Sequence, residues 1–480
     1  MTTITTAADA ATEAAIQVAT QPSNTETILN QINGFVWGPP LLILLVGTGV
    51  YFTFRLSLLQ FRYLPYALAL VFKKDPNPKT GDVSSFSALC TALSATIGTG
   101  NIVGVATAIK LGGPGALFWM WMAALFGMVT KYAECLLAVK YRKIDANGQI
   151  NGGPMHYLEA ATGNKFLAKI FAFFAIGVAF FGIGTFAQVN AIVDSAHNVF
   201  HLPEIATAVI LTTLVAIVTL GGIKSIARVA STVVPVMALG YVLTCTMLLI
   251  FNASAVPAAL QNIISSAFTG HAAAGGFAGA GIMLAIQAGV ARGVFSNESG
   301  LGSAPIAAAA AKTDSCVRQG LINMTGTFLD TIIICTMTGL ALVVTGVWSG
   351  DAAGAGMTTQ AFAAGLGSNW GPKLVSTGLI FFAFTTILGW NYYGERCAAY
   401  LFGTKAIFPY KLIFIGLIAS GVFLQLNTIW ILADIVNGLM AIPNLIGLLL
   451  LRKVVIAETQ SYFEQRRRIN VGTDLNSDMA

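Results

Sequence analysis

Eleven long apolar stretches run along the chain, separated by short segments that contain charged residues, glycine and proline. A helix needs about 20 mostly apolar residues to cross the hydrocarbon core of a bilayer, and most of the stretches come near that length. The pattern therefore predicts eleven transmembrane helices. They are expected at 35–55, 84–109, 114–137, 166–188, 204–220, 229–251, 276–310, 319–347, 372–394, 412–426 and 428–451.

The composition also indicates a polytopic membrane protein. Of the 480 residues, 56 % are hydrophobic and only 10 % are charged, whereas an ordinary soluble domain has about 25 % charged residues. So few charges cannot cover a soluble surface of this size, which excludes a cytosolic enzyme, a nucleic-acid binder and a disordered scaffold. The 50 glycines agree with this reading, because small residues let spanning helices approach closely and interrupt them where a site is built.

The basic residues fall on alternate connections between the stretches, which reports the orientation of the chain. Examples from five connections on the same side are Lys73, Arg142, Lys224, Arg318 and Arg466. Only three basic residues fall outside this pattern, namely Lys110, Arg292 and Lys373. The pattern predicts an odd number of spans in the cell (inner) membrane, with the amino terminus outside and the carboxyl terminus in the cytoplasm. We expect a polar tail at 1–34, an extra transmembrane helix at 35–57 and a cytoplasmic tail at 452–480.

Two of the stretches have a polar, glycine-rich interruption in the middle, at 97–101 and at 295–302. Such a break leaves backbone N–H and C=O groups without helical partners, and hydrocarbon cannot satisfy them. When the first span is set aside, each interrupted stretch is the first of five spans. This pattern is typical of secondary transporters with inverted repeats and broken helices at the midplane. We expect one five-helix repeat at 84–251 and a second at 276–451. The competing interpretation is that the glycines only permit close packing.

Four segments resemble the alanine or glycine:cation symporters, also called the sodium:alanine symporter family. They are residues 112–127 (GGPGALFWMWMAALFG), 151–155 (NGGPM), 296–302 (SNESGLG) and 390–395 (WNYYGE). The resemblance extends from about residue 35 to 455 and implies an all-α fold of LeuT type, with one additional helix at the amino end. It implies that the protein imports alanine or glycine together with sodium, or with protons in some members.

The first break reads Gly98-Thr99-Gly100-Asn101, which is similar to the Gly-Leu-Gly-Asn motif of LeuT-type carriers. In that fold the motif holds the carboxylate of the substrate, and free N–H groups at the start of a half-helix suit an anion. Carbonyl groups freed at the second break would suit the substrate ammonium. The residues expected to bind substrate are Thr99, Gly100, Asn101, Gln188, Phe295, Ser296, Asn297 and Trp390.

Some of these assignments have a structural alternative. Gln188 stands near a helix end, where an amide is commonly just solvated, and Phe295 and Trp390 are equally suited to ordinary packing. Glu298 is either a proton or cation site or the structural partner of Arg292, since an unpaired charge in the membrane is costly.

Sodium is a hard cation and binds best to oxygen. Thr385 and Thr386 are adjacent hydroxyls in an apolar stretch. In LeuT-type carriers a Thr-Ser pair on the corresponding helix holds sodium together with carbonyls of the first broken helix, and Ser94 and Ile97 occupy the matching positions here. The resemblance thus implies a sodium site made of Ser94, Ile97, Thr385 and Thr386. Two intramembrane carboxylates, Asp330 and Asp434, are either cation ligands or hydrogen-bonding groups between helices.

The sequence therefore predicts a sodium-coupled symporter for a small neutral amino acid that works by alternating access. No P-loop and no nucleophile motif is evident, so we expect neither an enzyme nor a cofactor, and sodium serves as the coupling ion. A proton-coupled symporter and a small-solute channel are the alternatives. The choices between alanine and glycine, between L and D isomers and between oligomeric states stay open.

Overall fold

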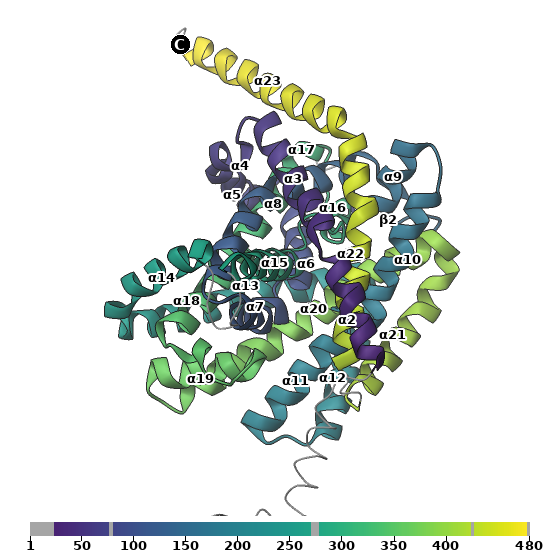
Figure 1. Ribbon diagram of the computed structural model, residues 1–480. Coiled ribbons are helices and arrows are strands. Elements are labelled where there is room, and N and C mark those ends of the chain that lie inside the picture. The colour runs from purple at the N-terminus through teal and green to yellow at the C-terminus, as the bar shows by residue number, and fades with distance from the viewer. Residues whose placement is uncertain (1–23, 76–79, 270–277, 424–426, 478–480) are drawn as a thin grey trace, which may run out of the picture.

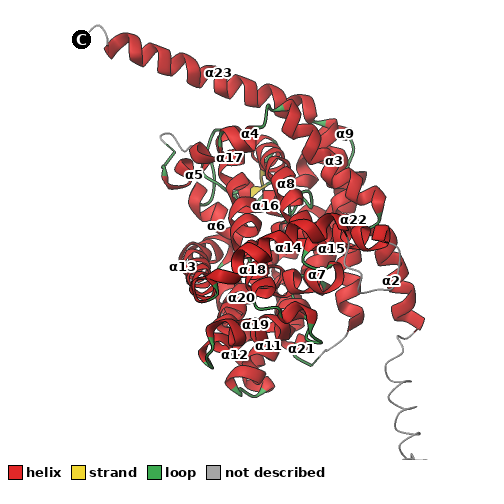
Figure 2. Ribbon diagram, turned by 60° about the vertical axis from the view of Figure 1, so that its left-hand side comes forward, coloured by secondary structure: helices red, strands yellow, loops and turns green. Residues whose placement is uncertain are grey.

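The computed structural model describes residues 24–75, 80–269, 278–423 and 427–477. Within these ranges helices overlap all eleven expected stretches. Among the described residues, eight helices are long and apolar enough to cross a membrane, or nine when one bent pair is counted as a single span. Figure 2 shows that helices dominate, and the described residues form one two-stranded sheet. The all-α polytopic fold predicted from the hydrophobic pattern is confirmed.

The amino-terminal helices lie outside the two repeats. Their bounds are α2 Asn24–Val36, α3 Pro39–Arg55, α4 Leu59–Arg62 and α5 Leu64–Phe72. Proline at the first two positions of α3 separates it from α2 without losing a helical hydrogen bond. The expected polar tail therefore ends in a helix, since α2 covers its last residues, whereas 1–23 lie outside the described part. The Nε1–H of Trp37 donates to the carbonyl of Asp434 at 3.0 Å and anchors this segment.

The first expected repeat contains a helix that is broken near its middle. The hydroxyl of Ser84 caps α6 by accepting from Ser87 N, and the helix bends by 50° where it is interrupted. The elements are α6 Ser85–Thr96, the π-helical turn η1 Gly100–Gly104, α7 Val105–Gly112, α8 Gly115–Lys140, β1 Lys143–Ile144, β2 Ile150–Asn151, α9 Pro154–Thr162, α10 Phe166–Phe181, α11 Phe186–Phe200, α12 Glu204–Leu220 and α13 Gly222–Phe251.

The second expected repeat is interrupted in the corresponding place, between α15 and α16. Glu298, Gly300 and Gly302 all have positive φ there, which ends α15 and re-aims the chain. The elements of the repeat are α15 Ala278–Asn297, α16 Ala304–Ala309, α17 Cys316–Thr327, η4 Phe328–Cys335, α18 Thr336–Val344, η5 Val347–Ser349, α19 Gly354–Leu366, α20 Trp370–Phe402, η6 Thr404–Ala406, α21 Ile407–Gly421 and α22 Asn427–Leu450. The helices η2 Ala253–Ala255 and α14 Val256–Thr269 precede the repeat, and α23 Arg452–Ser477 follows it.

The sequence reading missed three features of these helices. The expected span 166–188 is split, because α10 ends at Phe181 and α11 begins at Phe186 after a turn that contains Gly182 and Gly184. The expected span 372–394 continues as one helix to Phe402. The carboxyl-terminal tail forms a long helix, α23, which projects from the body in both views (Figures 1 and 2).

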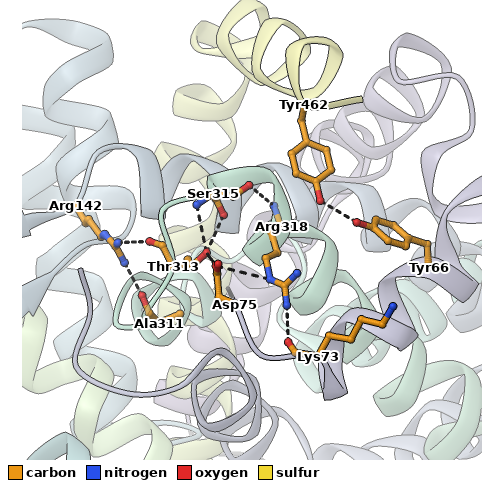
Figure 3. A network of polar contacts seen from close by, with 9 residues as sticks. All are labelled: Tyr66, Lys73, Asp75, Arg142, Ala311, Thr313, Ser315, Arg318 and Tyr462. Carbon is orange, nitrogen blue, oxygen red and sulfur yellow. Dashed lines mark hydrogen bonds and ion pairs between the residues drawn. The ribbon is translucent and has the colours of Figure 1, made fainter. Parts of the chain in front are cut away.

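The described part of the chain begins with α2 in the lower half of Figure 1 and ends with α23 at the top. The end that carries α5, α17 and α23 also carries Lys73, Arg142 and Arg318, and it is called the basic face below (Figure 3). Helix α23 is held there by an ion pair of 2.6 Å between Lys140 and Glu458. The hydrogen bond from Lys140 lowers the pKa of the Glu458 carboxyl.

Candidate functional site

The two helix breaks meet in the centre of the molecule at the carboxylate of Asp330. Its Oδ1 accepts from Asn101 Nδ2 at 2.7 Å, and its Oδ2 accepts from Ser296 Oγ at 3.0 Å. Thr331 Oγ1 donates to the same Oδ2 at 2.7 Å. Asp330 lies in the π-helical segment η4, and such local widenings are frequent at functional sites. The carboxylate thus joins the first break to the second without an ion pair.

The N–H groups freed at the first break are satisfied by side-chain oxygens. Gly98 N donates to Asn101 Oδ1 at 2.8 Å, and Thr99 N donates to Gln188 Oε1 at 3.3 Å. The other end of the Gln188 amide donates from Nε2 to Thr99 Oγ1 at 3.0 Å. The N–H groups of Gly98 and Thr99 at this break thus donate to side-chain amide oxygens, which are acceptors of the same kind as a carboxylate oxygen.

Gln188 lies in a different environment from the solvated helix end considered above. It is fully buried and stands one turn into α11, directly after the third break at 182–185. The signal in the sequence was the pair Gly182 and Gly184, which interrupts an apolar stretch just before this amide. The third break is therefore the reason why Gln188 reaches the middle of the molecule.

All eight residues expected to bind substrate are buried. The breaks are in direct contact, because a Cβ on Gly100 would meet Ser296 Cα at 3.0 Å and Phe295 Cδ1 at 3.4 Å. Asn297 Nδ2 donates to Thr331 Oγ1 at 3.0 Å, and Thr331 in turn donates to Asp330. Trp390 packs edge-on against Tyr393 at 5.4 Å between ring centroids. The structure thus brings six of the eight together and joins Asn297 to them through Thr331 and Asp330, whereas the ring contact of Trp390 is with a residue outside the eight.

Two of the four residues expected to bind sodium, Ile97 and Thr386, are in contact across the first break. Thr386 Oγ1 donates to the carbonyl of Ile97 at 3.4 Å and to that of Phe382 at 2.9 Å. Thr385 Oγ1 donates to the same Phe382 carbonyl at 3.1 Å. The hydroxyl of Ser94 bonds within its own helix, one turn before the break. The contact between α20 and the first break gathers neutral oxygens, which suit a hard monovalent cation.

Glu298 is not the partner of Arg292, which corrects one of the two interpretations given above. Arg292 instead forms a bidentate ion pair with Asp434, with distances of 3.1 and 2.7 Å. This pair gives Asp434 a structural role between α15 and α22 and balances its charge in place. Glu298 Oε2 accepts from Ser303 Oγ at 2.8 Å, across the second break.

A second buried carboxylate near this break, Glu134, was not recognised from the sequence. Its Oε1 accepts from Gly302 N at 3.1 Å and from Asn444 Nδ2 at 2.6 Å, and Asn444 also donates to the carbonyl of Gly300 at 2.8 Å. Lys131, one turn earlier on α8, is buried and interacts electrostatically with Glu134 and Glu298. The signal in the sequence was the presence of two charged residues, Lys131 and Glu134, inside an apolar stretch, because charged residues within spanning segments are usually functional or paired.

The described residues contain no group of three or more His, Cys, Asp or Glu side chains that could hold a metal ion. Any cation bound at this centre would therefore be held by hydroxyl, amide and backbone oxygens and by single carboxylates.

The membrane-length helices, two of them broken, and the buried polar site between the breaks have the architecture of the LeuT fold. In agreement, the fold of MhsT in complex with L-phenylalanine is similar, with a TM-score of 0.54 and 13 % identity. That match covers 80 % of this chain and 99 % of that chain.

The model of the sodium:alanine symporter family matches residues 22–474, and the chain belongs to that family. It is 50 % identical to the sodium/alanine symporter AgcS of Methanococcus maripaludis, over 92 % of this chain and 98 % of the relative. It is 62 % identical to an uncharacterised transporter of Haemophilus influenzae, over 93 % and 97 % of the two chains. The resemblance seen in the sequence is confirmed, and the protein is a transporter rather than an enzyme.

Gly98 and Gly104 provide a matched test of the packing at the first break. A Cβ on Gly98 would collide with Thr386 Oγ1, whereas a Cβ on Gly104 would meet its nearest atom, Thr99 O, at an ordinary 3.9 Å. We expect Gly98→Ala to destabilise the protein by about 1–3 kcal/mol, the usual cost of overpacking, and Gly104→Ala to change it little. Thermal unfolding of both variants in detergent measures this, and equal melting temperatures would contradict the contact.

Proposed function

We propose that the protein imports a small neutral amino acid, alanine or glycine, together with sodium across the cell (inner) membrane. The observation that carries the substrate assignment is the pair of amide oxygens, from Asn101 and Gln188, that accept from the N–H groups of Gly98 and Thr99. A carboxylate is the same kind of acceptor with a full charge, and charge-assisted hydrogen bonds are the stronger ones. The substrate carboxylate would therefore replace these oxygens.

The surroundings of this site favour a small substrate. Gly100 lies against Ser296 and Phe295, and Gly184 of the third break lies against Trp390. Such close packing around the break favours a substrate with a small side chain over one with a branched side chain. The relative named as a sodium/alanine symporter supports alanine as the substrate.

Sodium is assigned to the junction of α20 with the first break, on the contact between the Thr386 hydroxyl and the Ile97 carbonyl. The four proposed ligands are the hydroxyls of Thr385 and Thr386 and the carbonyls of Ser94 and Ile97. Because Ile97 directly precedes the residues that would hold the carboxylate, one short segment would contact both the ion and the substrate. This arrangement would couple the two bindings.

The mechanism that we propose is alternating access, in which the two repeats, 84–251 and 276–451, move against each other around the central site. The basic face would be cytoplasmic, because the excess of lysine and arginine sets the orientation of spanning helices. The carboxyl terminus would then lie in the cytoplasm and the amino terminus outside.

Asn101 links the first break to Asp330, so its removal tests the substrate site. We expect Asn101→Ala to reduce alanine uptake about tenfold or more at an unchanged protein level, because a hydrogen bond to a charged group contributes about 1.5–3 kcal/mol. Uptake of labelled alanine in vesicles measures this, and normal uptake would remove Asn101 from the site. Leucine should compete poorly, and strong competition by leucine would contradict a small pocket.

The sodium site predicts a selective effect of Thr386→Val, which keeps the shape of the side chain and deletes the oxygen. The variant should raise the sodium concentration needed for half-maximal uptake more than it changes the binding of saturating alanine. Thr377→Val is the matched control on the same helix, since Thr377 is exposed and bonds only to the carbonyl of Lys373. An unchanged sodium dependence, or equal uptake driven by a proton gradient without sodium, would show that the site or the ion is misassigned.

The orientation is tested by single cysteines in intact cells. A cysteine at Gln261, on the exposed surface of α14, should react with an impermeant thiol reagent, whereas one at Lys224, at the start of α13, should not. The reverse pattern would overturn the orientation.

Counterflow of labelled alanine in liposomes separates a carrier from the alternative of a channel. A carrier gives counterflow that saturates with alanine, whereas a channel gives a flux that does not saturate.

A further inference from the structure

The inner halves of the two broken helices are joined at the basic face, outside the helical spans. The chain just before α6 runs parallel to the chain just after α16, and Val83 pairs with Ala311. Asp82 N donates to Ala310 O at 2.8 Å, and Lys312 N donates to Val83 O at 2.7 Å. The ends of two helices that belong to different repeats are therefore held backbone to backbone.

Arg142 lies across this junction. Its Nη1 donates to the carbonyls of Ala309 and Ala311 at 2.8 and 2.7 Å, and its Nη2 donates to those of Thr313 and Thr80 at 2.6 and 3.1 Å. Figure 3 shows the guanidinium pointing into the loop that carries Ala311 and Thr313. A planar guanidinium with a fork of donors can serve several carbonyls at once, which the single ammonium of a lysine does with less geometric precision.

The charge of Arg142 suits its position at the end of α16. The carbonyl of Ala309 belongs to the last residue of that helix, where the negative end of the helix dipole favours a cation. Burial lowers the pKa of the Arg142 guanidinium, but an arginine stays protonated at neutral pH. Asp82 and Asp314 are the acidic groups that interact with it electrostatically.

The hairpin β1–β2, which follows Arg142 directly, connects this junction to α20. Asp145 in its turn forms an ion pair of 3.0 Å with Arg396, a buried residue of α20. On the other side, Ile150 N donates to Asp82 Oδ2 at 2.9 Å. The same helix α20 carries Thr386, which contacts the first break. The hairpin thus bridges the joined helix ends and the helix that would share the sodium site.

We infer that Arg142 is the clasp of the cytoplasmic gate, which holds the inner ends of α6 and α16 together and releases them when substrate leaves toward the cytoplasm. This inference rests on the proposed function of a carrier with a cytoplasmic basic face. Three of the four hydrogen bonds of Arg142 go to the α16 side, at Ala309, Ala311 and Thr313, and one goes to Thr80 on the α6 side. Arg142 therefore holds both ends at once, and at least one of these two sets of bonds must break when the ends separate. Arg142 is a gating residue and does not touch the substrate.

Cys90 provides a native reporter, because it lies in α6 close to the basic face and is buried. In a variant that keeps only this cysteine, an impermeant maleimide applied to the basic side of inside-out vesicles should react slowly. Arg142→Gln should increase the rate several-fold, and Arg142→Lys should restore part of the protection. Lys143→Gln is the matched control, since Lys143 is exposed and pairs only at 3.5 Å with Glu159. An unchanged rate in Arg142→Gln would overturn the inference.

A second reporter separates opening of the gate from misfolding. Cys245 is buried in α13, away from the junction, and as the sole cysteine it should stay protected in Arg142→Gln. An equal increase at Cys90 and Cys245 would assign Arg142 a general structural role and would also overturn the inference.

Gly81→Ala disturbs the junction on the α6 side while Arg142 itself is unchanged. Gly81 has a φ of +146°, and a Cβ there would meet Ala311 O at 2.5 Å, so the variant should also expose Cys90. Labelling needs no alanine, so it tests the clasp separately from transport. A lack of alanine uptake by the parent protein would count against the proposed function only.

Discussion

The centre of this fold depends on one constraint, that a backbone N–H or C=O group without a helical partner inside a membrane must form a hydrogen bond elsewhere. Two helices are broken near their middle, and each break leaves backbone groups without a helical partner. The chain provides oxygens for the freed N–H groups from Asn101 and Gln188. It ties both breaks to Asp330, a carboxylate stabilised by donors rather than by a counter-ion. The freed N–H groups are therefore satisfied by side-chain oxygens, as the proposed exchange with a substrate carboxylate requires.

The buried and partly buried charges of Arg292, Arg396 and Lys411 are stabilised in a different way, by ion pairs. Arg396 contacts Glu395 as well as Asp145, and Lys411 adds a contact of 3.0 Å to Glu395. These groups lie at the end of α20 toward the hairpin, whereas Arg292 pairs with Asp434 between α15 and α22. Burying a charge is costly unless it is paired and hydrogen-bonded. The paired charges therefore stay fixed between helices, and the centre keeps a hydrogen-bonded carboxylate and neutral oxygens.

The sequence predicted the features that depend on local pattern. The breaks at 97–101 and 295–302 were visible because glycine and polar residues interrupt apolar stretches, and the family was visible in the segments quoted above. Features that depend on distant partners were not predictable in this way. The ion pair of Arg292 with Asp434 joins residues 142 positions apart, and nothing near Arg292 distinguishes Asp434 from Glu298. The third break could not be predicted from its glycines alone, since Gly182 and Gly184 are equally compatible with close packing of an unbroken helix.

The hydrogen bonds of the proposed clasp at Arg142 bear on which amino-acid replacements the surrounding positions tolerate. Its four acceptors are main-chain carbonyls, which every amino acid supplies, so the side chains at 80, 309, 311 and 313 contribute nothing to those four bonds. The four hydrogen bonds therefore require particular residues at only two positions, 142 and 81. Position 142 must supply the forked donor, and position 81 must supply a residue that tolerates a φ of +146° beside the Ala311 carbonyl. Ala309, Ala311 and Thr313 are constrained instead by their burial, so in a saturation library scored for transport they would be sensitive to side-chain size, whereas position 142 would be sensitive to the loss of the forked donor.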